Sequence, residues 1–309
     1  MVIAILLLAC FVGEPVLERV LGHGPNDVFP HAVTQNLKPV GPWTHVADLN
    51  STAPITASTP RTLFVLGADG PLGRDQFLRL LAGGRTSLEV ALGATALALL
   101  IGTLLGSLAA FYGGVVDAVI SRLTEFAMGF PLLFLIVALG FTISNRVNDV
   151  TFDLFTPGTL MLVLVIGLFN WFYIARLVRS QVLVLREREF VEAARMIGAG
   201  NLYIVRKHIL PHLTSTLVVY GTLIIAATMI VEAGFAFVNF GVPTPYASWG
   251  NMLSTNWGTL LAPGGQGAVA ETSFWTSFFP TAAVFTTVFA FSLAGEGLRR
   301  AFDPHMGRA

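Results

Sequence analysis

The lysines are the first residues to consider, because a chain that bound ATP by itself would need a glycine-rich loop ending in Lys and then Ser or Thr. The only lysines are Lys38, which precedes a proline, and Lys207, which precedes His208. There is no His-Glu-x-x-His and no Gly-x-Ser-x-Gly motif. His208 and His212 are four residues apart, but Pro211 lies between them. We therefore expect no enzymatic activity and no metal site in this chain.

Two acidic residues, Glu125 and Glu232, fall within apolar stretches, where a charge is costly and usually faces a cavity or a partner. Arg122 precedes Glu125 by three residues, so a local ion pair explains that carboxylate without any role in transport. Glu232 has no basic residue nearby, and it either lines a translocation path or makes a subunit contact. Polar residues that either line a path or pack helices together are Asn170, Tyr220 and Thr228.

The segment from Arg186 to Pro211 combines charged residues with an apolar repeat at helical spacing, which predicts an amphipathic helix. Gly198 and Gly200 end this helix, and Asn201 is placed to cap a second short helix with its side chain. We therefore predict a helix-turn-helix that projects from the rest of the chain. An apolar stripe on such a projection would be left in water, which favours a protein partner. The stripe consists of Phe190, Ala193, Ala194 and Ile197.

The composition indicates that lipid surrounds these elements. Of 309 residues, 54% are hydrophobic and 12% charged, and the mean hydropathy is +0.72. Soluble domains carry about 25% charged residues, so a water-soluble enzyme is improbable. The 18 basic and 18 acidic residues balance, which argues against a nucleic-acid binder. The single cysteine, Cys10, leaves no disulfide framework.

Apolar stretches long enough to cross a bilayer predict an all-α membrane protein with six transmembrane helices. The first stretch is short, running from Val2 to Val12 and extending toward Leu17. In the second, Gly102 and Gly106 have the spacing at which another helix can approach closely. In the third, Pro131 predicts a kink. The five clear spans are roughly Leu88 to Phe111, Glu125 to Ile143, Gly158 to Leu177, Leu213 to Phe235 and Trp275 to Ala294.

The placement of Lys and Arg orients these spans, because cytoplasmic loops carry an excess of both. The segment from Arg176 to Lys207 holds seven basic residues, and the tail 299–309 holds three. Only Arg146 lies in the short loop between the third and fourth spans, on the opposite side. Both termini are therefore expected in the cytoplasm.

The N-terminal part of the chain is expected to cross the bilayer once and then remain outside. Residues 1–17 form the predicted first span, with a cleaved signal peptide as the alternative because Leu7 to Cys10 resembles part of a lipoprotein cleavage box. Residues 18–87 form an extracytoplasmic loop, which up to Leu66 predicts little regular structure. Asp75 to Leu81 is either a short interfacial helix or a plain connector.

The projecting segment also resembles a known motif. Glu192-Ala193-Ala194, then Gly198 after three residues, then a stretch that ends in Ile209, Leu210 and Pro211, is similar to the EAA motif of permease subunits in bacterial ABC importers. Further segments resemble the C-type subunit of the dipeptide, oligopeptide and nickel branch, although Asn239 stands where a glycine is usual. These segments are Leu66 to Leu88, Arg122 to Pro131, Ser248 to Gly250 and Gly295 to Pro304.

The resemblance implies a type I importer (MetI-like) fold with a five-helix permease core at 88–298 and a coupling loop at 179–211. It also implies a bacterial inner-membrane permease subunit for di- or oligopeptides that binds no cofactor itself. Its partners would be a homologous B-type permease, two ATPase subunits that use ATP and Mg²⁺, and an extracytoplasmic binding protein. Glu192 is the expected charged contact to the ATPase.

Two rival functions remain open from the sequence. An importer of nickel or another small solute belongs to the same branch, and no residue in the spans selects peptides. An ion-coupled carrier that needs no ATPase would require a polar cluster in the middle of the membrane, which is not evident in the sequence.

Overall fold

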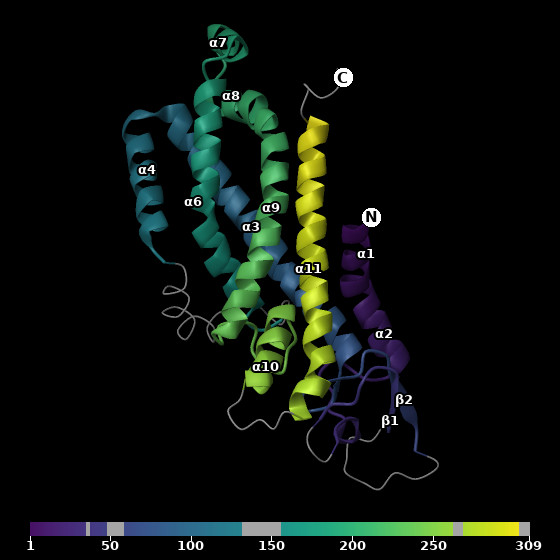
Figure 1. The fold of residues 1–309 in the computed structure, drawn as a ribbon. Coiled ribbons are helices and arrows are strands. Elements are labelled where there is room, and N and C mark those ends of the chain that lie inside the picture. The colour runs from purple at the N-terminus through teal and green to yellow at the C-terminus, as the bar shows by residue number, and fades with distance from the viewer. Residues whose placement is uncertain (35–37, 48–58, 132–155, 262–267, 303–309) are drawn as a thin grey trace. The chain divides into compact units, whose positions relative to one another are not determined.

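The computed structural model describes residues 1–34, 38–47, 59–131, 156–261 and 268–302, without the side chains of 256–261 and 268–273. Helices dominate the described residues, as predicted (Figure 1). The chain divides into two compact units. The first comprises 1–90, 147–160 and 229–290, and the second comprises 91–146, 161–228 and 291–309.

Among the described residues, four helices are long and apolar enough to cross a membrane, and they correspond to the second, fourth, fifth and sixth predicted spans. The third predicted span begins in α4 and continues beyond the described residues, which also exclude Arg146 and the tail after Phe302. The helices of this group are α3 (Gln76–Tyr112), α4 (Gly114–Gly129), α6 (Thr159–Leu185), α9 (Leu210–Phe237) and α11 (Ala268–Phe302).

The predicted first span is helical but is not among those four helices. The segments α1 (Val2–Leu8) and α2 (Glu14–Leu21) join through a π-helical turn, η1 (Ala9–Gly13), with helical backbone angles at both junctions. The second half of this predicted span, α2, carries charged residues. Glu14 is buried there, and its Oε2 lies 3.6 Å from Nη1 of Arg85 in α3. The helix ends at Gly22, whose φ of +73° favours glycine.

The segment between α2 and α3 is more ordered than the sequence predicts. The expectation of little regular structure is wrong there, because Phe29, Val46 and Phe64 bury their side chains in a small core. Phe29 and Phe64 meet edge to face with ring centroids 5.2 Å apart. The elements are a 3₁₀ turn, η2 (Pro30–Ala32), and two antiparallel pairs, β1 (Thr44–Ala47) with β2 (Arg61–Phe64) and β3 (Ala68–Asp69) with β4 (Arg74–Asp75).

Helix α3 begins where Asp75 caps it. The Asp75 carboxylate accepts hydrogen bonds from the amides of Phe77 at 2.8 Å and Leu78 at 3.4 Å, which satisfies two of the free donors of the first turn. The helix then runs unbroken to Tyr112. The predicted interfacial helix at Asp75 to Leu81 is therefore the first part of α3, and not a separate element.

The buried His23 side chain ties the segment after α2 to this cap. His23 Nε2 lies 3.1 Å from Asp75 Oδ2, and its ring packs against Phe29 and Phe64. The hydrogen bond to Asp75 raises the pKa of His23, although burial opposes the shift. Arg79 reaches Asp69, the Asn26 side chain and a backbone carbonyl of the first unit. The segment before α3 is thus held by buried polar contacts as well as by its apolar core.

In the second unit, α3 and α6 pack closely through the two glycines of the predicted motif. A Cβ on Gly102 would lie 2.5 Å from Ile174 Cβ and 2.6 Å from the Trp171 carbonyl oxygen. A Cβ on Gly106 would lie 2.5 Å from the Ala175 carbonyl oxygen. No side chain fits at either position without displacing a helix backbone. The predicted close helix contact is confirmed.

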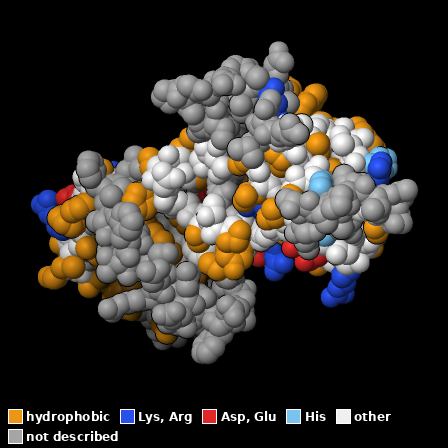
Figure 2. Space-filling model, turned by 90° about the horizontal axis from the view of Figure 1, so that it is seen from below, with side chains coloured by type: hydrophobic (Ala, Val, Ile, Leu, Met, Phe, Trp, Pro, Cys, Tyr) orange, Lys and Arg blue, Asp and Glu red, His pale blue; other side chains and the backbone are white. Residues whose placement is uncertain are grey.

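Seen from below the view of Figure 1, the coloured atoms of the space-filling view are mostly hydrophobic or uncharged, and the charged side chains form small groups (Figure 2).

Candidate functional site

The predicted helix-turn-helix is present at the end of α6 (Figure 1). Its first arm, α7 (Glu189–Met196), ends in a Schellman motif, because the amide of Ala199 bonds to the Ala194 carbonyl and the amide of Gly198 bonds to the Arg195 carbonyl, each at 3.0 Å. Gly198 has a φ of +85°. This left-handed conformation is open to glycine and costly for most other residues. Gly198 therefore sets the direction in which the chain turns.

The second arm is α8 (Asn201–Ile204), which continues through a π-helical turn, η3 (Val205–Ile209), into α9. Gly200 and not Asn201 is its N-cap, and no side chain caps it. The expectation for Asn201 is wrong by one position, because Asn201 is already helical. The helix of the fifth span thus begins at Asn201, ahead of Pro211.

One face of the loop is buried against the ends of α3, α6 and α9. Val191 and Ala194 from α7 join Ile204 and Ile209 from the second arm in one apolar cluster. Partners from the spans include Ala110, Phe111, Ile174, Val178, Val182 and Leu213. The Phe190 ring stacks on His212, with centroids 5.1 Å apart and the planes 9° from parallel. The loop therefore rests on a packed base.

The buried face is not the predicted stripe. Of the four predicted residues, Ala194 is buried, Phe190 is partly buried, and Ala193 and Ile197 are exposed. Helix α7 stops at Met196, and Ile197 is its C-cap, directly before the reversal at Gly198, so Ile197 leaves the helical repeat. Val191 takes its place in the core.

Arginines add polar contacts to this base. Arg186 donates a 2.7 Å hydrogen bond to the Ala110 carbonyl near the end of α3, and the Arg195 guanidinium lies 5.6 Å from the centre of the Phe111 ring. Arg179 of α6 makes a two-pronged contact with Asp117 of α4. The Arg179 guanidinium lowers the pKa of the Asp117 carboxyl. The Arg186 and Arg195 contacts fix the loop to the end of α3, and the Arg179 contact joins α6 to α4.

The loop also exposes large apolar side chains, together with charged residues such as Arg195. Glu192, Ala193 and Gly198 are also exposed on it, whereas Ile209 is buried and Leu210 is partly buried. The EAA residues thus divide into an outward set and a set that packs the base. We call the outward apolar residues the exposed loop face, and they are Met196, Ile197, Leu202 and Tyr203, with exposed fractions of 82%, 85%, 76% and 56%.

The sequence predicts the loop but not most of the residues of its exposed face. The signal was present, since four large apolar side chains stand within eight residues that also contain two glycines. Assigning them required the backbone reversal at Gly198, which periodicity does not reveal.

Glu232 is enclosed by other residues of the first unit. Its side chain is buried, and Oε2 accepts a 3.1 Å hydrogen bond from Ser87 of α3. The Ser87 hydroxyl also accepts the amide N–H of Trp249, at the start of α10 (Trp249–Leu261). Gly250 leaves space for the carboxylate, because a Cβ there would lie 3.2 Å from Oε1. The carboxylate therefore joins α3 to α9 within the first unit.

The other residues singled out from the sequence lie in different surroundings. Arg122 and Glu125 form the expected ion pair at 3.0 Å on an exposed face of α4. Asn170 donates to the carbonyl of the preceding helical turn, and Thr228 is buried. Tyr220 lines a cavity. Among the described residues, no group of three or more His, Cys, Asp or Glu side chains is placed to hold a metal ion.

A family model described as the inner membrane component of binding-protein-dependent transport systems matches residues 102–308. The chain belongs to this family. A Brucella ovis protein named as a peptide permease is 39% identical over 247 residues, which cover 80% of this chain and 75% of that one. The dipeptide transport system permease protein DppC of Bacillus subtilis is 32% identical over 237 residues, 77% of this chain and 68% of the relative. The oligopeptide permease OppC of the same organism is also 32% identical.

Solved structures of the family's type share the fold. An inward-facing structure of the MetNI methionine ABC transporter matches with a TM-score of 0.53 at 20% identity, over 72% of this chain and 95% of that one. The predicted type I importer fold is confirmed. Members of the family are membrane permease subunits of ABC importers and are not the catalytic subunits. The permease is therefore a multi-pass membrane protein that works with other subunits.

Asn239, where the resemblance implied a glycine, has a φ of +60°. Asparagine is among the few residues that tolerate this left-handed region, so the replacement keeps the backbone conformation.

Proposed function

We propose that this permease forms half of the translocation pathway of an ATP-driven importer of di- and oligopeptides. The names of its relatives support peptides as the solute. A homologous B-type permease supplies the other half, and an extracytoplasmic binding protein delivers the peptide. Both termini and the α7–α8 loop lie in the cytoplasm, as the distribution of Arg and Lys favours.

The two ATPase subunits use ATP and Mg²⁺, and one of them binds the α7–α8 loop. Closure of the ATPase dimer then moves this loop and reopens the pathway outward. Glu192, exposed beside the apolar residues, contributes the charged contact.

The observation that carries this proposal is a rigid base under an exposed apolar face. Large apolar side chains on a projection are unfavourable in water unless a partner covers them. The opposite face is fixed by an apolar cluster and by the Arg186 hydrogen bond to Ala110. A force applied to the exposed loop face is therefore transmitted to α3, α6 and α9 instead of bending the loop.

Replacing Ile197 by Ala tests the docking role. The change removes about three methylene equivalents, worth about 2.4 kcal/mol when fully buried at about 0.8 kcal/mol each. Because 85% of Ile197 is exposed before docking, about 2 kcal/mol is lost, which weakens ATPase binding about thirtyfold. Val115 of α4 is 80% exposed and lies outside the loop, so Val115→Ala is the matched control.

Both variants are expressed with the whole transporter, and ATPase co-purification and uptake are measured. Ile197→Ala should reduce both, while Val115→Ala matches the wild type. If both variants retain the ATPase equally, the loop is not part of the permease–ATPase interface. Uptake of a labelled dipeptide against uptake of ⁶³Ni²⁺ by the wild type separates the peptide importer from a nickel importer.

A further inference from the structure

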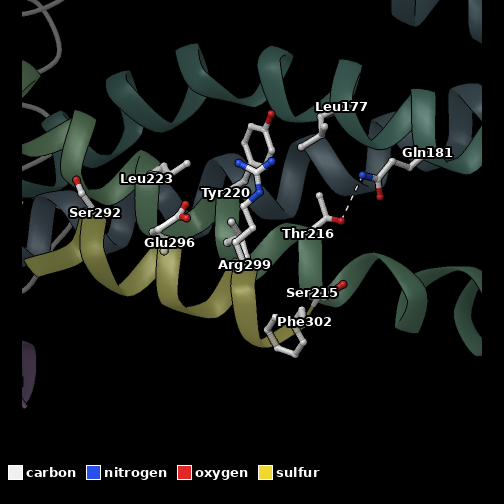
Figure 3. Close-up of a pocket in the computed structure, with 12 residues that line it drawn as sticks. Leu177, Gln181, Ser215, Thr216, Tyr220, Leu223, Ser292, Glu296, Arg299 and Phe302 are labelled. Carbon is white, nitrogen blue, oxygen red and sulfur yellow. Dashed lines mark hydrogen bonds between the residues drawn. The ribbon is translucent and has the colours of Figure 1, made fainter. Parts of the chain in front are cut away.

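A cavity of about 660 Å³ opens within the second unit between α6, α9 and α11 (Figure 3). This volume lies in the range of small-ligand pockets and accommodates a short peptide. Apolar walls come from Leu177, Val219, Leu223 and Phe302. The polar groups that line it are Gln181, Ser215, Thr216, Tyr220, Ser292, Glu296 and Arg299.

The cavity has a fixed boundary at one end. Gly295 of α11 packs directly on α9, since a Cβ there would lie 2.4 Å from Thr222 Oγ1. Beyond Gly295, the last turns of α11 line the cavity together with α9. On another wall, Gln181 of α6 donates a 3.3 Å hydrogen bond to Thr216 of α9 (Figure 3). Contacts within the unit thus hold the walls.

Both signs of charge line this one cavity. Arg299 makes no ion pair and no hydrogen bond to another described residue, and it lines the cavity together with Tyr220 (Figure 3). Glu296 pairs with Arg300 at 3.0 Å along the same helix, but both side chains are about half exposed or more. Such an exposed pair is weak and leaves the carboxylate able to accept further donors.

We propose that this cavity binds a short peptide during its passage, with Arg299 holding the C-terminal carboxylate. This inference rests on the proposed peptide import and adds the position where the permease contacts its solute. A guanidinium matches a carboxylate with two parallel hydrogen bonds. The hydroxyls and the Gln181 amide face backbone groups of the peptide, and the Leu177, Leu223 and Phe302 walls accept apolar side chains.

Glu296 favours binding of a peptide in this cavity over binding of an anionic lipid. A lipid phosphate beside Arg299 would also face the Glu296 carboxylate, which repels it and offers it no donor. A peptide carries an ammonium group as well as a carboxylate, so its two ends complement the two charges. The peptide ammonium is therefore placed on the Glu296 side.

Arg299→Gln tests the proposal, with Arg300→Gln as the matched control. Both arginines lie in the last turn of α11, but Arg300 does not line the cavity. The permease–ATPase complex is placed in phosphatidylcholine nanodiscs without the binding protein. Binding of dialanine and of dialanine amide is measured by saturation-transfer NMR. The wild type and Arg300→Gln should prefer the free carboxylate by about tenfold or more, and Arg299→Gln should lose that preference.

Equal preference in Arg299→Gln and the wild type would overturn the proposal, as would no binding of dialanine to the wild type. Displacement of dialanine by phosphatidylglycerol in the wild type and Arg300→Gln but not in Arg299→Gln would assign the cavity to lipid and overturn it too. These measurements need neither ATP nor the binding protein. If dialanine does not bind while ATP-driven peptide uptake persists, this inference fails and the proposed function stands.

Discussion

Replacing Gly198 by Ala should weaken the α7–α8 loop through backbone strain alone. A Cβ at this position meets no atom within 4 Å, so no contact is gained or lost. The φ of +85° remains, and a left-handed conformation costs a non-glycine residue about 1–2 kcal/mol. Because the Schellman motif depends on this residue, the substitution destabilises the turn between the two arms.

A cost of that size raises the population of opened loops about five- to thirtyfold. Hydrogen exchange of the peptide 189–204 measures it directly, because amide exchange follows the opening equilibrium. Gly198→Asn should exchange more slowly than Gly198→Ala, because asparagine tolerates the left-handed region. Gly200→Ala is the control, since Gly200 has a φ of −70° and equally open surroundings.

In the assembled transporter, a less rigid loop should also partly uncouple ATP hydrolysis from uptake. The transporter with Gly198→Ala should therefore hydrolyse more ATP for each peptide that it imports. If Gly198→Ala and Gly200→Ala show the same exchange rates and the same coupling ratio, backbone conformation at Gly198 is not what makes the loop rigid.

Two further predictions concern packing and pH. Gly102→Ala should lower stability by about 1–3 kcal/mol through its clash with α6, seen as a lower thermal midpoint in detergent. Gly297→Ala, with open space around it, should not lower stability, and equal midpoints would contradict the close helix contact. The His23–Asp75 contact raises the pKa of His23, so its stabilisation is complete below about pH 6.5 and is lost as pH rises through the higher folded pKa. Protease protection of residues 22–75 should therefore fall with rising pH, and His23→Gln should remove that dependence.

Much of the architecture follows from local signals in the sequence. Long apolar stretches locate four of the described helices, and Gly102 and Gly106 predict the contact that the α6 backbone makes with α3. The helix-turn-helix follows from charged residues, apolar spacing and glycine punctuation. Each of these signals lies within one continuous stretch of the chain, so one sequence suffices to read it.

What the sequence could not supply are contacts between distant residues. Ser87 and Glu232 are 145 positions apart, and neither has a local feature that points to the other. Ile197 has the spacing of a buried residue, but a backbone reversal exposes it. The cavity beside Arg299 needs three helices, whose relative rotation no periodicity determines.

The Ser87 hydroxyl links two other helices to α3, since it donates a hydrogen bond to Glu232 and accepts one from the Trp249 amide. The starts of α3 and α10 and the final turns of α9 consequently behave as a single mechanical body. Sliding α3 would break both bonds, and sliding α9 or α10 would break one of them, in each case between buried groups. During a transport cycle these three helix ends must travel together, and the deformation that admits a solute has to be absorbed elsewhere in the protein.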